Sequence, residues 1–146
     1  MFTTHLIQPA EHAAWWQRVR HSPDHRVLVL NCQGQDCGVV TFTRAAAGVG
    51  DDGATWDWGF YLGPDSFAQP LDQLRAWSAM ERESLSWAAT PLQARHLHCE
   101  VLAGNAAVLA LHRRHGFIER GRYWRERDGE SLEVIQLGRA LAAAAA

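Results

Sequence analysis

One segment, residues 97–117, constrains the fold of this chain more than any other. It opens with an apolar strand pattern and passes through a Gly-containing turn to Asn105, a residue type that caps helices well. A helix over 104–115 is expected next, and Gly116-Phe117 ends it and leads into another strand. The segment therefore predicts a strand, a helix and a strand in close succession.

The rest of the chain adds two helices and four strands to this unit. Apolar residues at helical spacing predict a short amphipathic helix over 9–21 and a long helix over 71–87 that packs one face on a sheet. Asp128-Gly129 is expected to turn a closing hairpin. The predicted strands are 26–32, 38–43, 56–62, 95–102, 117–127 and 131–137. This order describes a mixed sheet covered by helices, in the α/β (α+β) class.

Length and charge exclude several classes of protein. The 146 residues fit one domain, expected over 1–139, with an Ala-rich, frayed tail over 140–146. The formal net charge of -2 provides no electropositive field for nucleic acid, and no apolar run approaches the roughly 20 residues of a membrane span. All 14 basic side chains are arginines, which excludes a Schiff-base lysine.

The three cysteines predict a protein of a reducing compartment. Cys32 and Cys37 flank a short turn and could form a disulfide, but half-buried strand thiols are the preferred interpretation. Because the count is odd and no secretory leader is recognised, we expect a cytoplasmic protein. Cys99 alternates with apolar neighbours, so we expect a buried thiol and no nucleophile.

A metal centre is not expected from the histidine-rich strand. Residues two apart point to the same side, so His96, His98 and Glu100 share one face while Cys99 lies on the other. No remote cluster of ligands completes a tetrahedron. We therefore expect no metal ion.

Taken in order, these motifs resemble the GNAT N-acetyltransferases. The resemblance sharpens to one branch, which acetylates UDP-4-amino-4,6-dideoxy-N-acetyl-β-L-altrosamine during pseudaminic acid synthesis for flagellin glycosylation. The matching segments are 1–5, 11–12, 22–26, 59–62, 97–105 and 115–117. Family members carry a further strand and helix before the segment where this chain starts. The resemblance thus implies a GNAT sheet, mostly antiparallel with helices on both faces, without the family's first strand and helix.

The implied activity is acetyl transfer from acetyl-coenzyme A to a small-molecule amine, with the 4-amino group of a UDP-amino-sugar as first choice. A GNAT that acts on a protein N-terminus is a second enzyme hypothesis. The alternative from another class is a degenerate module that binds no acetyl-coenzyme A and serves in binding or assembly. A homodimer is compatible with each of these, and neither nucleic acid nor membrane is an expected partner.

The resemblance also implies which residues hold acetyl-coenzyme A. The expected contacts are Tyr61, Leu62, Gln69, Asn105 and His112, with a backbone N–H near Tyr61 or Leu62 as donor to the tetrahedral oxygen. The loop 66–72 takes the place of the family's Gly-rich pyrophosphate loop but has no glycine. Pro70 lacks a donor and Asp72 repels phosphate, so this loop favours the degenerate alternative. Asn105 could also simply cap its helix.

Two residues are candidates for proton transfer. His112 stands where the family often has a tyrosine acid, and its alternative is a partly exposed surface histidine. Glu100 could orient a water for the amine, and its alternative is a salt bridge to a nearby arginine. Trp56 and Trp58 are expected in the core, whereas Tyr61 is the better ligand candidate. The implied acceptor contacts are Met1, Phe2, His5, Tyr61 and Glu100.

Overall fold

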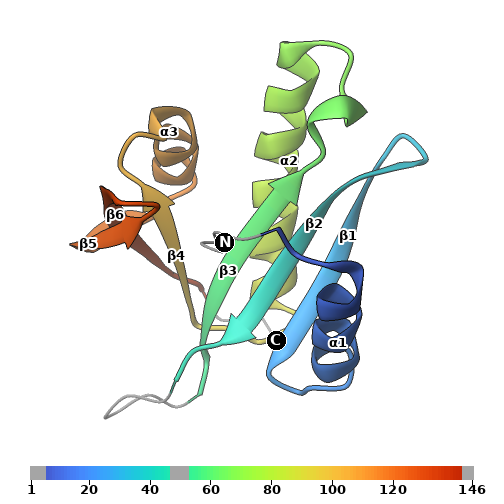
Figure 1. Ribbon diagram of the computed structural model, residues 1–146, viewed down its shortest axis with the longest axis horizontal. Coiled ribbons are helices and arrows are strands. Elements are labelled where there is room, and N and C mark those ends of the chain that lie inside the picture. Colours follow the sequence, from blue (N-terminus) through green and yellow to red (C-terminus); the bar gives the residue numbers. More distant parts are fainter. Residues whose placement is uncertain (1–5, 47–52, 143–146) are drawn as a thin grey trace.

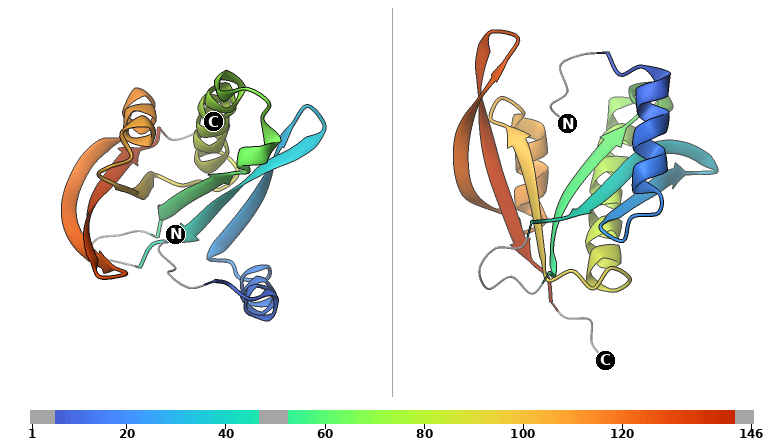
Figure 2. Two further views of the ribbon diagram at one scale, coloured as in Figure 1. Left: turned by 45° about the horizontal axis from the view of Figure 1, so that its top comes forward. Right: turned by 60° about the horizontal axis from the view of Figure 1, so that its bottom comes forward.

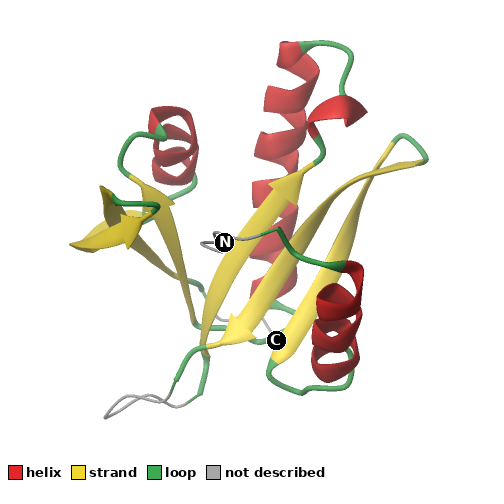
Figure 3. Cartoon of the chain, in the orientation of Figure 1, coloured by secondary structure: helices red, strands yellow, loops and turns green. Residues whose placement is uncertain are grey.

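The computed structural model describes residues 6–46 and 53–142, and these form a six-stranded mixed sheet flanked by helices (Figure 1). The order of elements is the predicted one, as the cartoon in Figure 3 shows. The elements are α1 (Pro9–Val19), β1 (His25–Cys32), β2 (Gln35–Arg44), β3 (Thr55–Leu62), a 3-10 turn (Pro64–Ser66), α2 (Pro70–Ala89), β4 (His96–Leu102), α3 (Ala106–Arg114), β5 (Ile118–Arg127) and β6 (Glu130–Ala140).

The strands lie in the order β1-β2-β3-β4-β6-β5, and every neighbouring pair is antiparallel except β3 and β4. Helices α2 and α3 cover one face of the sheet, and α1 lies on the other (Figure 2). Each of α2 and α3 follows one of the two parallel strands, so both helices return along the same face. The parallel pair at the centre therefore has two helices above it.

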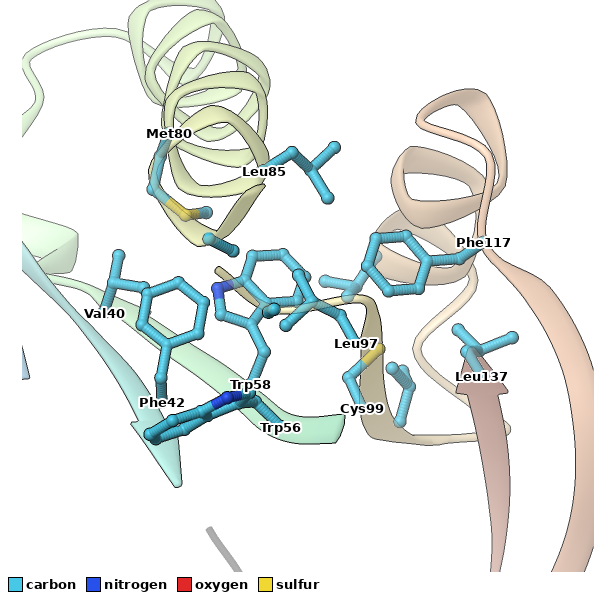
Figure 4. Close-up of a cluster of buried hydrophobic side chains, with 14 of the residues drawn as sticks. Val40, Phe42, Trp56, Trp58, Met80, Leu85, Leu97, Cys99, Phe117 and Leu137 are labelled. Atoms are coloured by element: carbon cyan, nitrogen blue, oxygen red, sulfur yellow. The ribbon is translucent and has the colours of Figure 1, made fainter. Parts of the chain in front are cut away.

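Alternation along β3 decides which face is buried. Trp56, Trp58 and Leu62 are buried, whereas Tyr61, on the opposite face, is 63% exposed. The two tryptophans join the core beneath α2, as Figure 4 shows. Their expected place in the core is confirmed.

Residues with positive backbone φ angles lie at two of the predicted turns. Asp128 and Gly129 have φ of 50° and 80°, the pattern of a two-residue hairpin turn, and join β5 to β6 as expected. Gly116 has φ of 86° directly after the last turn of α3. A Cβ at this position would lie 3.3 Å from Nε of Arg139. The positive φ therefore favours glycine here, and an added Cβ would also require the Arg139 side chain to shift slightly.

The cysteines near the first hairpin differ from the expectation. Cys32 and Cys37 form a disulfide at the end of the hairpin, with their Cα atoms 6.0 Å apart. The preferred interpretation as two free thiols was wrong, because the bulge after Leu30 and the short turn bring the two side chains together. Cys99 is free and buried, as predicted. The cytoplasmic location, inferred from the odd cysteine count and the lack of a recognised leader, stays a prediction.

Two element boundaries also differ from the sequence expectation. Strand β6 continues to Ala140, which pairs with His96, so the first residue of the predicted tail belongs to the sheet. Residues 143–146 of that tail lie outside the described residues. Helix α1 forms as predicted, but among its expected apolar contacts only Val19 is buried and Trp16 is 39% exposed. None of the described helices is both long and apolar enough to cross a membrane.

Strand β1 forms one edge of the sheet. Among the described residues no further strand pairs with it, and Val29 is 60% exposed there. A cavity of about 470 Å³ lies beside this edge, between β1 and α2, with Leu28, Leu30 and Trp87 in its wall.

We predict that Gly116→Ala lowers the free energy of unfolding by about 1 to 2 kcal/mol, because alanine is strained at positive φ and meets Arg139. Urea unfolding measures the change. Gly104→Ala is the matched control: no atom lies within 4 Å of its added Cβ, and the change should stay within about 0.5 kcal/mol. Equal stability of the two variants would contradict the account of this turn.

Candidate active site

The centre of the sheet opens between its two parallel strands. Strands β3 and β4 pair at Thr55–His96, Trp56–Leu97 and Asp57–His98 and then separate. Beyond this point β3 stays paired with β2 as far as Leu62, and β4 stays paired with β6 as far as Leu102. Each strand thus stays paired with its outer neighbour while β3 and β4 diverge from each other, as Figure 1 shows. We call the region between the two separated strands the gap.

The hydrogen-bond pattern decides which backbone groups of β3 face this gap. Gly63 donates its N–H to the carbonyl of Cys37 in β2, at 2.8 Å. Main-chain groups alternate in direction along a strand, so Tyr61 also turns its N–H toward β2, whereas Phe60 and Leu62 turn theirs toward β4. Of the two donors expected for the tetrahedral oxygen, Leu62 has the correct direction and Tyr61 does not.

The same reasoning applies to β4. Ala103 donates its N–H to the carbonyl of Glu133 in β6, so Glu100 turns its main-chain groups toward β3. Phe60, Leu62 and Glu100 have no ladder partner across the gap in the described part of the chain. Unpaired backbone groups inside a sheet are satisfied by water, by side chains or by a ligand. An extended ligand that carries amides and a carbonyl matches them.

Aromatic rings line the helix side of the gap. Trp58 stacks on Phe117, with ring centroids 5.5 Å apart and planes 13° apart. His112 of α3 meets Trp58 and Phe60 edge-on, at centroid distances of 5.2 and 5.9 Å. The face beneath α2 and α3 is therefore apolar, with one histidine among the rings.

His112 forms a buried pair with Glu81 of α2. Nδ1 of His112 lies 2.8 Å from Oε1 of Glu81, and the side chains are 2% and 0% exposed. The alternative of a partly exposed surface histidine is therefore wrong, because α3 turns this residue inward against β3. Oε2 of Glu81 is buried without a hydrogen-bond partner among the described residues, as is Nε1 of Trp58.

Sequence reasoning missed Glu81. Its spacing could have revealed it. Glu81 lies four residues after Trp77 and four before Leu85, which places it on the apolar stripe of the predicted long helix. A carboxylate in the middle of such a stripe is rarely left without a partner. Its partner, however, lies 31 residues away on another helix, and only the fold brings the two together.

Glu100 lies on the opposite face of the sheet, exposed to solvent. Tyr123 donates its hydroxyl to Oε2 at 2.7 Å, and Gln136 donates its side-chain amide to Oε1 at 3.3 Å. Within the described residues, these two hydrogen bonds take the place of the alternative, a salt bridge to an arginine. The hydrogen bond to Glu100 is also the main cause that raises the pKa of Tyr123.

Asp57 adds a second carboxyl group to this face. Its pKa is raised, first by partial loss of solvation and then by the charge of Glu100, while His98 acts in the opposite direction. The side chains of His98 and Glu100 are exposed beside it on β4. No group of three or more metal-ligating side chains occurs within residues 6–46 and 53–142.

The remaining predicted contacts are only partly brought together. Leu62 is buried on the helix face, Tyr61 is exposed on the other, and Gln69 lies at the start of α2. Asn105 caps α3 by accepting a hydrogen bond from the Val108 N–H at 3.4 Å, as its alternative interpretation stated. The predicted acceptor contacts Met1, Phe2 and His5 lie outside the described residues.

The first turn of α2 provides few donors for an anion. Pro70 has no N–H, and the N–H groups of Asp72 and Gln73 both point to the carbonyl of Gln69. Asp72 adds negative charge, which Arg75 at 3.7 Å partly offsets. This helix start is therefore a poor cradle for phosphate, as its sequence predicts.

Comparisons with known proteins agree on the architecture. No family model matches the sequence, and no curated protein matches it either. Solved structures do match. A spermidine N-acetyltransferase from Vibrio cholerae in complex with CoA and spermine is 15% identical, with a TM-score of 0.78 over 95% of this chain and 79% of that one. The chain has the GNAT fold.

Two further structures support this assignment. A ribosomal-protein-alanine N-acetyltransferase from Brucella melitensis is 20% identical, with a TM-score of 0.77 over 97% of this chain and 83% of that chain. An acetyltransferase of the GNAT family from Streptococcus pneumoniae is also 20% identical, with a TM-score of 0.69 over 94% and 78%. The predicted fold is thereby confirmed. The branch that acts on UDP-amino-sugars stays a prediction.

We predict that Cys99 resists alkylation in the folded protein. Burial, followed by the charges of Glu81, Glu100 and Asp57, raises the pKa of this thiol to about 12, so the reactive thiolate is scarce at pH 8. Iodoacetamide should modify Cys99 about a thousandfold more slowly in buffer than in urea, as mass spectrometry would show. Equal rates of modification in buffer and in urea would contradict this prediction and would make Cys99 a candidate nucleophile again.

Proposed function

We propose that the chain is an N-acetyltransferase that transfers the acetyl group of acetyl-coenzyme A to an amine. The observation that carries this proposal is the gap between β3 and β4, where unpaired backbone groups lie between a buried histidine on one face and an exposed carboxylate on the other. The two amides and the thioester carbonyl of acetyl-pantetheine are complementary to those backbone groups. The GNAT fold of the neighbouring structures supports the same conclusion.

In the proposed reaction the amine nitrogen attacks the thioester carbon, and the carbonyl oxygen becomes an oxyanion. The N–H of Leu62, which points into the gap, donates to that oxygen. Glu100, directly or through water, takes a proton from the amine on the open face. The C–S bond then breaks with its electron pair on sulfur, and His112 donates a proton to the thiolate.

A UDP-amino-sugar is the proposed acceptor, on the strength of the sequence resemblance. Tyr61 stands exposed on the face that carries Glu100, where it can contact a sugar or uracil ring. A protein N-terminus is the second acceptor hypothesis. Among the matching structures the named acceptors include both spermidine and a ribosomal-protein alanine. We further propose a cytoplasmic location, as expected for an enzyme that uses acetyl-coenzyme A and nucleotide sugars.

The alternative function is a module that has lost acetyl-coenzyme A. The observation in its favour is the start of α2, where Pro70 and Asp72 replace a phosphate cradle. Titration calorimetry with acetyl-coenzyme A separates the two. The enzyme hypothesis predicts heat of binding, whereas a folded protein that gives no heat at millimolar ligand would favour the module.

We predict that His112→Gln lowers kcat by about a hundredfold and changes the KM for acetyl-coenzyme A less than twofold. The glutamine amide can still donate a hydrogen bond to Glu81, so the buried carboxylate keeps a partner. The amide cannot act as a general acid, however. Arg113→Gln, at an exposed neighbour on α3, is the control and should leave turnover unchanged. Unchanged turnover in His112→Gln would remove the acid role.

We predict that Asp72→Asn tightens binding of acetyl-coenzyme A about two- to fivefold, because it removes one negative charge near the proposed phosphate position. The gain should shrink as salt is added, since Asp72 is half exposed. Calorimetry at low and high salt measures both effects. Glu83→Gln, farther along the same helix, should bind as the unsubstituted protein does. If Asp72→Asn and Glu83→Gln bind acetyl-coenzyme A with the same affinity, the phosphates do not lie near the start of α2.

A further inference from the structure

We propose that Glu81 is a positioning residue, which fixes the tautomer of His112 and balances its charge so that Nε2 is the ring atom that transfers a proton in the gap. This inference rests on the proposed acetyl transfer. It adds to the site a residue in the middle of α2, which the proposed reaction does not otherwise use.

The first step is the proton on Nδ1. In the proposed arrangement Glu81 is a carboxylate, which only accepts hydrogen bonds, so Nδ1 of His112, 2.8 Å away, carries the hydrogen between them. The tautomer is assigned from this hydrogen bond together with the charge given to Glu81. It leaves Nε2, on the far side of the ring from Glu81, as the nitrogen that can exchange a proton with a substrate.

The second step is the direction of Nε2. Glu81 holds the ring from the side of α2, while Trp58 and Phe60 of β3 contact the ring edge-on. In the described part of the chain His112 makes no side-chain hydrogen bond other than the one to Glu81. Nε2 is therefore unpartnered among the described side chains, on a ring that packs against β3, the strand whose Leu62 N–H faces the gap.

The third step concerns the charge that His112 carries when it acts as an acid. A donor at Nε2 needs both ring nitrogens protonated, which puts a positive charge among aromatic side chains. Glu81, itself 0% exposed, supplies the opposite charge at hydrogen-bond distance. When the Nε2 proton passes to the departing sulfur, the ring becomes neutral and keeps its Nδ1 hydrogen bond. The ring is thus held in place to take up the next proton, as a carboxylate holds the histidine of a catalytic triad.

A structural ion pair is the competing explanation, and two variants distinguish it. Glu81→Gln keeps an oxygen that accepts from Nδ1 but removes the charge, and Glu81→Leu removes both. The positioning role predicts that Glu81→Gln lowers kcat about ten- to a hundredfold with the KM for acetyl-coenzyme A within twofold. Glu81→Leu should lower kcat further. The matched control is Glu83→Gln, an exposed glutamate two residues along α2, which should turn over at the unsubstituted rate.

Nitrogen NMR of histidine-labelled protein provides a readout that does not need turnover. The signal of His112, assigned by its loss in His112→Gln, should show a protonated Nδ1 in the unsubstituted protein and in Glu81→Gln. In Glu81→Leu the proton should redistribute toward Nε2. Circular dichroism establishes that each variant is folded.

Two results would overturn the inference: an unprotonated Nδ1 in the unsubstituted protein, or a folded Glu81→Gln that turns over as fast as Glu83→Gln. Failure of the proposed function looks different. In that case the unsubstituted protein acetylates no amine although its spectrum still shows the Nδ1 proton, and the positioning role falls together with the reaction that it serves.

Discussion

The separation of β3 and β4 after three residue pairs is the feature on which the rest of the site depends. A sheet normally satisfies its backbone groups strand by strand, yet here Phe60, Leu62 and Glu100 turn main-chain groups toward a neighbour that has moved away. The outer pairings with β2 and β6 hold both strands in place, so the gap cannot close by simple re-pairing. A ligand with amide and carbonyl groups completes the ladder.

The gap also separates two environments. On the helix face, aromatic rings surround the Glu81–His112 pair and exclude water, which strengthens electrostatic effects there. On the open face, Glu100 and Asp57 remain in contact with solvent. A group-transfer reaction with a cationic amine on one side and a departing thiolate on the other needs these two environments. In the proposed complex, affinity for acetyl-coenzyme A comes mainly from the gap, because the start of α2 offers few hydrogen-bond donors.

Local sequence signals were sufficient for most of the fold. The alternation in β3, the Asp128-Gly129 turn and the Asn105-to-Gly116 helix all formed as expected, because each depends on neighbours in the sequence. The site was harder to predict. The pairing of Glu81 with His112 depends on the packing of two helices, and the direction of the Leu62 N–H depends on the pairing of β3 with β2. The disulfide was missed because a strand bulge, which the sequence did not reveal, governs it.

The central claim is that acetyl-coenzyme A lies in this gap with its amides and carbonyl against the backbone. Backbone NMR during titration with coenzyme A tests this claim most directly, because it reports each N–H separately. The account predicts the largest changes at the amides of Phe60, Leu62 and Glu100, with small changes at Tyr61, whose N–H is already bonded to β2. Changes confined to other surfaces, with the three gap amides unmoved, would contradict it.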